Sequence, residues 1–196
     1  MIDPAKVVDQ YKDCAASLLR APDDPRALLA MFELLINNGS RARITHYLPL
    51  ARRAYEIDPN EPNTVFNYAS ALSLAGRNVE AIELYQRVFD LGDPNWKASA
   101  LYHIGIAFRA LGENEQAIRY YRTAVALDPE NYQAQQDIAL ATMAAGRLNE
   151  GLKLFEVRHK LAERDPLADL LGELVPHERL PSVRQLSREL VINPNT

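Results

Sequence analysis

The sequence predicts an all-α fold in which helical hairpins stack into an array, and three observations lead to this prediction. A similar stretch occurs three times, at residues 74–95, 110–131 and 144–160. The apolar residues of each copy have helical spacing, and glycine and proline recur between the apolar stretches. Internal repeats with periods of about 20 to 50 residues are typical of solenoids, because one hairpin cannot bury its own apolar face without neighbours.

Three aligned columns describe the repeat, at periods of 36 and then 34 residues. They hold a glycine, a small residue and an aromatic residue: Gly76, Gly112 and Gly146; Ala81, Ala117 and Gly151; Tyr85, Tyr121 and Phe155. The glycine ends the first helix of a hairpin, because it adopts the left-handed conformation without a Cβ clash. The small residue lets two helices approach closely, and the aromatic ring fills the space between neighbouring units.

Each unit is therefore expected to contain two amphipathic helices. In the unit at 98–131 the two apolar stripes are Leu101, Ile104, Gly105 and Phe108, then Ala117, Tyr120, Tyr121 and Ala124. Proline is expected to close the second helix at three equivalent dipeptides, Asp58-Pro59, Asp93-Pro94 and Asp128-Pro129. Another helix is expected to start near Thr45, which places Pro49 in or near its first turn.

These columns resemble the tetratricopeptide repeat, and the segment from Ala98 to Pro129 matches its small and large positions most closely. The unit near 62–94 has a short extension before its proline. The unit at 25–59 carries an insertion, although it retains the positions Gly39, Ala51, Ala54 and Pro59. The resemblance implies a right-handed α-solenoid in which the first helix of every hairpin lines a concave groove.

The expected domain organisation follows the repeats. It consists of an N-terminal capping helix at 1–24, an array of four repeats (25–61, 62–97, 98–131 and 132–164), and capping helices or a linker at 165–196. Arg158 stands where a small residue would face a further repeat, so stacking is expected to stop there. The ends of a solenoid need their apolar faces covered, which assigns capping roles to the two terminal segments.

Composition narrows the class of protein. The chain has 196 residues, with 22 basic and 26 acidic side chains and a formal charge of -4, so no general positive field favours nucleic acid or an anionic membrane. Its single cysteine, Cys14, cannot form an internal disulfide, and the chain opens without a basic and then apolar leader. No apolar run approaches the roughly 18 residues of a membrane span. We expect a cytoplasmic protein that binds neither nucleic acid nor membrane.

Catalytic chemistry is not indicated. The four histidines, His46, His103, His159 and His177, include no pair at helical ligand spacing, and no nucleotide-binding, hydrolase or zinc motif accompanies them. We therefore expect no catalytic, metal or cofactor site. The adjacent carboxylates of Asp23 and Asp24 lie between helices, where capping or solvation is favoured over acid–base work.

Two basic clusters favour the interpretation of a solvated helix face. They are Arg41, Arg43, Arg52 and Arg53, then Arg158, His159, Lys160 and Arg164. For the first cluster, a patch that meets an acidic partner is the open alternative.

The family resemblance implies a partner-binding groove along the first helices. Its predicted residues, carried over by position, are Glu33, Asn63, Phe66, Asn67, Ser70, Tyr102, His103, Ile106, Arg109, Gln133, Gln136, Asp137, Leu140 and Met143, together with Leu29, Ile36 and Ser99. Side chains at three positions, Phe66, Tyr102 and Met143, are expected to grip a partner, and Arg109 is expected to meet a carboxylate.

Asn67, His103 and Asp137 fall in one column of this groove. They are expected to form a polar ladder that hydrogen-bonds the backbone of an extended peptide. The alternative is that His103 and Asp137 satisfy each other between helices and that the aromatic residues belong to the core.

The leading functional hypothesis is a protein–protein interaction module that holds a peptide or helix of a partner of unknown identity. A second hypothesis rests on residues 144–160, which weakly resemble the closing repeat of arrays that precede bacterial glycosyltransferase-like domains. In that case the array would recruit substrates to a catalytic domain beyond it. A third is homo-oligomer formation, if the C-terminal segment enters a groove instead of capping its own array.

Overall fold

The computed structural model describes the backbone of residues 4–38, 43–92 and 94–162. Within these ranges the regular structure is nine α-helices. They are α1 (Pro4–Arg20), α2 (Pro25–Asn38), α3 (Ile44–Ile57), α4 (Pro62–Leu74), α5 (Asn78–Asp90), α6 (Pro94–Ala110), α7 (Asn114–Leu127), α8 (Tyr132–Ala144) and α9 (Leu148–Ala162). The all-α prediction is confirmed.

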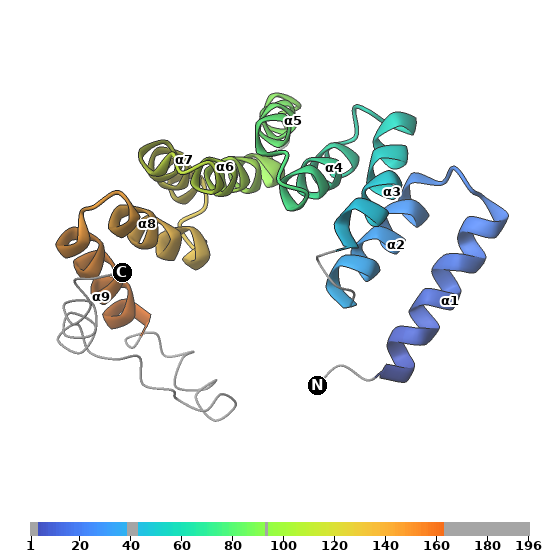
Figure 1. Ribbon diagram of the computed structural model, residues 1–196, viewed down its shortest axis with the longest axis horizontal. Coiled ribbons are helices and arrows are strands. Elements are labelled where there is room, and N and C mark those ends of the chain that lie inside the picture. The colour runs from blue at the N-terminus through green and yellow to red at the C-terminus, as the bar shows by residue number, and fades with distance from the viewer. Residues whose placement is uncertain (1–3, 39–42, 93, 163–196) are drawn as a thin grey trace.

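The helices form an arch that runs from α1 at one end to α9 at the other (Figure 1). Each helix packs mainly on the next one in the chain, and further contacts join α2 to α4 and α4 to α6. The arch carries α4, α6 and α8 toward its inner side, with α5 on the outer side of α4 (Figure 1). We call the inner side formed by α4, α6 and α8 the concave face.

The aromatic and small columns form the core, as predicted. Ala81 and Ala117 are fully buried, and Tyr85 and Tyr121 have exposed fractions of only 1% and 0%. The Tyr85 ring belongs to the same buried cluster as Ile104 of α6, so it fills the space between successive hairpins.

Glycine ends the first helix of three hairpins in the way the sequence predicts. Gly76, Gly112 and Gly146 have φ angles of 80°, 81° and 84°. After α4, the Gly76 amide donates to the Ser73 carbonyl at 3.0 Å and the next amide reaches back to Leu72 at 2.9 Å. The same pair of bonds follows Gly112 and Gly146. This pattern satisfies carbonyls that the helix end would leave without donors.

Proline closes two second helices, but the prediction is wrong for the third. Helices α3 and α7 end directly before Asp58 and Asp128. Helix α5 instead ends at Asp90, before Gly92 with its φ of 87°, and Pro94 is the first residue of α6. A missing N–H costs nothing at the first helical position, so proline starts a helix there. The boundary predicted between residues 97 and 98 therefore falls inside α6.

Pro49 lies deeper in its helix than predicted. Helix α3 begins at Ile44, which makes Pro49 its sixth residue and places it in the second turn. Proline cannot donate to the Thr45 carbonyl there, but both residues are exposed, so water can reach the freed acceptor.

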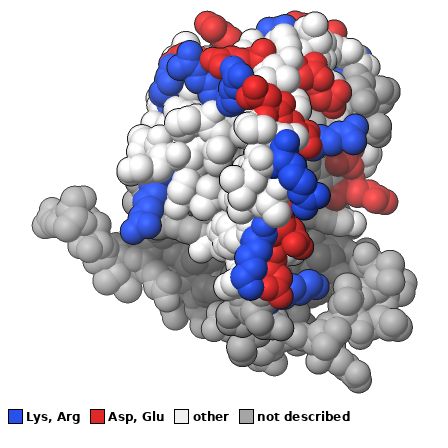
Figure 2. All heavy atoms as spheres, turned by 90° about the vertical axis from the view of Figure 1, so that its right-hand side faces the viewer, with Lys and Arg blue, Asp and Glu red and all other residues white. Residues whose placement is uncertain are grey.

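Helix α1, to which the sequence assigns a capping role, packs on α2 at the first face of the array. The Tyr11 hydroxyl donates to the Leu34 carbonyl at 3.0 Å, and Leu18 packs on the cluster of Leu28 in α2. The cover is partial, because Leu19 keeps 85% of its surface exposed. Acidic and basic side chains are interspersed at this end of the molecule (Figure 2).

Several predictions fall outside the described residues. These are Gly39 and Arg41 in the insertion, Asp93, the side chains of the second basic cluster, and the capping or linker role of 165–196. Among the helices that the structure describes, none is long and apolar enough to cross a membrane.

We expect Gly105→Ala to destabilise the protein through Tyr121. A Cβ at position 105 would lie 2.5 Å from Tyr121 Cε1, inside van der Waals contact. The overpacking should lower the free energy of unfolding by about 1–3 kcal/mol, even though alanine favours a helix. Urea denaturation measures this change. In a Tyr121→Leu background the same substitution should cost much less, and an equal cost in both backgrounds would refute the explanation.

Candidate partner-binding surface

The residues predicted to line the groove lie on α2, α4, α6 and α8, and the structure brings a central group of them together. Phe66 of α4 and His103 of α6 are in edge contact, with ring centroids 4.8 Å apart. Tyr102 lies 5.2 Å from the His103 ring in the same manner. Phe66, Tyr102 and His103 are all half-buried, in contrast to the fully buried Tyr85 beneath them. We call these three residues the aromatic cluster.

The alternative prediction for the aromatic cluster is also partly right. Phe66 packs against the core of Tyr85, and Tyr102 packs against the cluster that contains Tyr121. These rings therefore contribute to the core with one part of their surface and leave the rest accessible. Such a ring can serve both packing and recognition.

His103 is held in a defined protonation state. Its Nδ1 lies 2.9 Å from the Ser99 carbonyl oxygen, which can only accept, so Nδ1 carries the proton. Burial lowers the pKa of His103, although the Ser99 carbonyl partly opposes this effect. At neutral pH the ring is therefore neutral, and its Nε2 is an acceptor.

Asn67, His103 and Asp137, the column predicted to bond a peptide backbone, each have a different hydrogen-bond partner within the array. Asn67 donates to Asn63 within α4, at 3.1 Å to its carbonyl and 2.7 Å to its side-chain oxygen. His103 is bonded within α6 and Asp137 is bonded to Tyr102. Among the described residues no hydrogen bond joins any two of the three, so the alternative in which His103 and Asp137 satisfy each other is wrong.

Asp137 is paired with Tyr102 instead of with His103. The Tyr102 hydroxyl donates to Asp137 Oδ2 at 2.9 Å and links α6 to α8. Asp137 is 4% exposed, so this hydrogen bond supports a carboxylate that burial would otherwise penalise. Burial and the carboxylate together raise the pKa of Tyr102 far above its ordinary value.

Arg109 completes this part of the surface from the end of α6. Its guanidinium lies near the Tyr121 hydroxyl, yet no hydrogen bond of ordinary geometry joins the two groups. Burial alone would lower the pKa of Arg109, but the neighbouring Tyr121 hydroxyl and Asp137 carboxylate raise it. Burial raises the pKa of Tyr121 to about 12.

The remaining predicted residues are spread over the arch. Ser70 pairs with the Tyr85 hydroxyl at 3.0 Å, and Ile106 packs on the cluster of Tyr121. Met143 lies against Gly151 of α9, which reduces what it can offer to a partner. Glu33, Gln133, Gln136 and Leu140 are exposed or half-buried, whereas Leu29 is 3% exposed and belongs to the core. Glu33 lines a separate cavity of about 350 Å³ between α1 and α2.

Sequence reasoning missed one aromatic residue at this surface, Trp96. Trp96 lies 5.1 Å from the Phe66 ring, and its place in α6 becomes visible only once Pro94 is recognised as a helix start. The repeat itself indicates that the Tyr121 hydroxyl lacks the partner that Tyr85 has. Ser70, which bonds Tyr85, aligns with Ile106, which cannot bond the corresponding hydroxyl of Tyr121.

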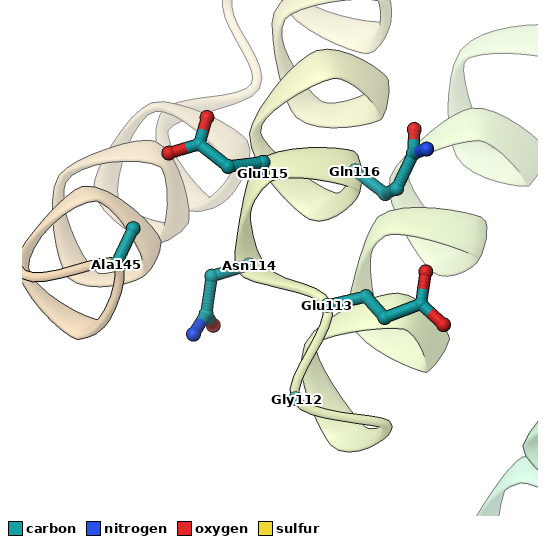
Figure 3. Close-up of a pocket in the computed structure, with 6 residues that line it drawn as sticks. All are labelled: Gly112, Glu113, Asn114, Glu115, Gln116 and Ala145. Carbon is teal, nitrogen blue, oxygen red and sulfur yellow. The ribbon is translucent and has the colours of Figure 1, made fainter.

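A second cavity, of about 370 Å³, lies at the turns that follow α6 and α8. Figure 3 shows Glu113 and Gln116 pointing to one side of the α6–α7 turn, with Glu115 directed toward the turn at Ala145. Glu115 forms an ion pair with Arg147 at 3.1 Å, so its charge is already matched. This cavity lies away from the aromatic cluster, and no sequence motif marks it.

Two arginines of the first basic cluster, Arg52 and Arg53, are paired with acidic neighbours. Arg52 pairs with Glu56 at 2.8 Å, and Arg53 pairs with Asp23 at 2.9 Å. These exposed ion pairs favour the interpretation of a solvated helix face over that of an acidic-partner patch. Within the described residues no group of three or more histidine, cysteine or acidic side chains is arranged to hold a metal ion.

Comparison with known proteins identifies the repeat. A family model for the tetratricopeptide repeat matches residues 61–130, which include the helices that carry the aromatic cluster. Residues 61–130 therefore match the tetratricopeptide repeat (TPR) family. A TPR repeat-containing protein of Treponema pallidum (strain Nichols) is 34% identical over 129 residues, or 64% of this chain. The chain spans only 15% of that longer relative.

Solved structures share the fold. The crystal structure of MamA superposes with a TM-score of 0.64 at 21% identity and covers 79% of this chain and 87% of its own. YrrB, a TPR protein with an unusual peptide-binding site, superposes with a TM-score of 0.58 at 17% identity over 93% of each chain. These likenesses establish a TPR solenoid.

We expect the lowered pKa of His103 to make the fold sensitive to mild acid. The unfolded chain binds a proton at a higher pH than the folded one, so stability is complete above the unfolded value of about 6.5 and falls as the pH drops below it. Urea denaturation between about pH 7.5 and 5.5 should show a shallower loss for His103→Gln than for the parent. The exposed His46→Gln is the matched control and should follow the parent. A His103→Gln profile parallel to the parent would contradict this account.

Proposed function

We propose that this TPR array is an interaction module whose concave face binds a segment of a partner protein. One observation carries the proposal: the aromatic cluster of Phe66, Tyr102 and His103 is half-buried across two neighbouring hairpins. Aromatic rings with an apolar body and a polar edge are enriched where protein surfaces associate. A surface of this kind suits the side chains of an extended peptide or one face of a helix.

Polar groups beside the aromatic cluster support the same proposal. Asn67 uses its amide nitrogen within α4, which leaves its oxygen able to accept a further bond. The His103 Nε2 is an acceptor at neutral pH for the reason given above. These two acceptors, on neighbouring helices, complement the N–H groups of a partner backbone. Such bonds favour binding that depends little on the sequence of the partner.

The rigidity of the array contributes to binding. Helix ends closed at Gly76, Gly112 and Gly146, and buried tyrosines between hairpins, hold the concave face in one shape. A preformed surface loses less entropy on association than a flexible one. The peptide-binding site of YrrB, a protein of the same fold, is consistent with this use of a TPR array. The proposal assigns no catalytic, metal or cofactor role, and a cytoplasmic location remains a prediction.

The second candidate is that the array recruits substrates for a larger enzyme. The length of the Treponema relative, of which this chain spans 15%, favours a role within a longer protein. The glycosyltransferase-like context suggested by residues 144–160 remains a hypothesis. Sequencing the natural reading frame tests it, since a stop codon directly after Thr196 would remove this candidate.

Partner capture with matched variants tests the leading proposal. Phe66→Leu combined with Asn67→Arg should alter the concave face while keeping an apolar side chain at the partly buried position. Arg122→Glu, on the exposed side of α7, is the control. We expect a partner segment, identified by mass spectrometry and then made as a peptide, to bind the parent and the control equally and the double variant about tenfold or more weakly in calorimetry.

Circular dichroism and urea denaturation must first show that the double variant is folded. Equal affinity of the parent and the folded double variant would contradict binding at the concave face. Selective loss with Arg122→Glu would move the binding surface to the outer helices.

A further inference from the structure

The Tyr121 hydroxyl has no hydrogen bond of ordinary geometry among the described residues, and the guanidinium of Arg109 is its polar neighbour. In the preceding repeat the hydroxyl of Tyr85 pairs with Ser70 at 3.0 Å. At the same position of the next repeat Ser70 becomes Ile106, and the buried Tyr121 hydroxyl has no hydrogen-bond partner among the described residues. In the third copy the column holds Phe155, which has no hydroxyl. Because an unpaired buried hydroxyl costs stability, its presence at 121 calls for a ligand.

A cation lies beside this hydroxyl. The cation is the exposed guanidinium of Arg109. The neighbouring repeats have no charged residue in this column, where Ser73 and Met143 stand. Its guanidinium interacts with both Tyr121 and Asp137, but the described residues show no ion pair between Arg109 and any carboxylate. An exposed arginine can change rotamer, so it can admit a ligand group to the hydroxyl that it adjoins.

The third group of this arrangement is the carboxylate of Asp137, which interacts with Arg109. Asp137 is 4% exposed and receives one hydrogen bond, from Tyr102, among the described residues. A carboxylate has about four acceptor positions, so this group keeps capacity for another donor. Arginine and tyrosine donors therefore approach from α6 and α7, and a carboxylate acceptor approaches from α8.

This arrangement selects by charge. A ligand carboxylate would be attracted by Arg109 but repelled by Asp137. A ligand ammonium group would be attracted by Asp137 but repelled by Arg109. A neutral amide satisfies both sides, because its oxygen accepts from Arg109 and Tyr121 while its N–H donates to Asp137. We propose that Arg109, Tyr121 and Asp137 form a subsite for a neutral amide group of the bound segment. The inference rests on the proposed function and replaces the carboxylate that the sequence led us to expect at Arg109.

Two sources of amide are chemically equivalent at this point, an asparagine or glutamine side chain and a backbone peptide unit. Small probes separate them and need no partner protein. Propionamide represents the side chain, N-methylacetamide represents the backbone, and propionate and propylammonium are the charged analogues. NMR titration of the whole chain follows the Arg109 Nε–Hε signal and the Tyr102 and Tyr121 ring signals.

We expect the preferred amide to shift these signals saturably, with an apparent Kd about fivefold or more below those of propionate and propylammonium. Tyr121→Phe should weaken that amide about fivefold, and Tyr85→Phe, whose hydroxyl is bonded to Ser70, should not change it. Asp137→Asn should shift the preference toward propionate. Stronger binding of propionamide would assign the subsite to a side chain, and stronger binding of N-methylacetamide would assign it to the backbone.

Two results would overturn the subsite. One is binding of either charged analogue at least as tight as that of both amides, and the other is the absence of saturable shifts at these signals with every probe. Either result, together with a partner peptide that still depends on Phe66 and Asn67, would reject the amide subsite and leave the interaction module standing. Amide binding without any dependence of partner capture on the concave face would instead reject the proposed function.

Discussion

The close approach of neighbouring helices over buried aromatic rings is the contact on which the rest of the array depends. Gly105 of α6 lies directly against the Tyr121 ring of α7, where even a methyl group would overlap the ring atoms. Fully buried alanines at positions 81 and 117 belong to the same buried clusters as Tyr85 and Tyr121. Because this packing sets the spacing within and between hairpins, it also sets the curvature that makes one side of the arch concave (Figure 1).

That packing explains why polar chemistry gathers between α6 and α8. Large rings fill the interior, and Phe66, Tyr102 and His103 are half-buried on α4 and α6, two helices of the concave face. Asp137 is buried there and is supported by Tyr102, a residue 35 positions earlier in the chain. A repeat protein thus places residues of successive units side by side, and small changes within one column create chemistry that the other units lack.

Repetition made much of this structure predictable. Aligned glycines identified three helix ends, because only a residue without a Cβ adopts their positive φ without strain. The aromatic and small columns identified Tyr85, Tyr121, Ala81 and Ala117 as core. Proline was a weaker guide, since it can end one helix or begin the next, and Pro94 begins α6. The contacts of the candidate surface could not be predicted, because they join residues of different hairpins, such as Tyr102 and Asp137.

The sequence by itself determined the helices, the repeat and the side of each hairpin on which polar and aromatic residues gather. These follow from local periodicity, and each needs only neighbouring residues of the chain. Only the tertiary structure decided the hydrogen-bond partners: Tyr102 with Asp137, His103 with Ser99, and Tyr121 with none among the described residues. Hydrogen bonds depend on distances and directions within a few tenths of an ångström, and the packing of one hairpin on the next sets these distances.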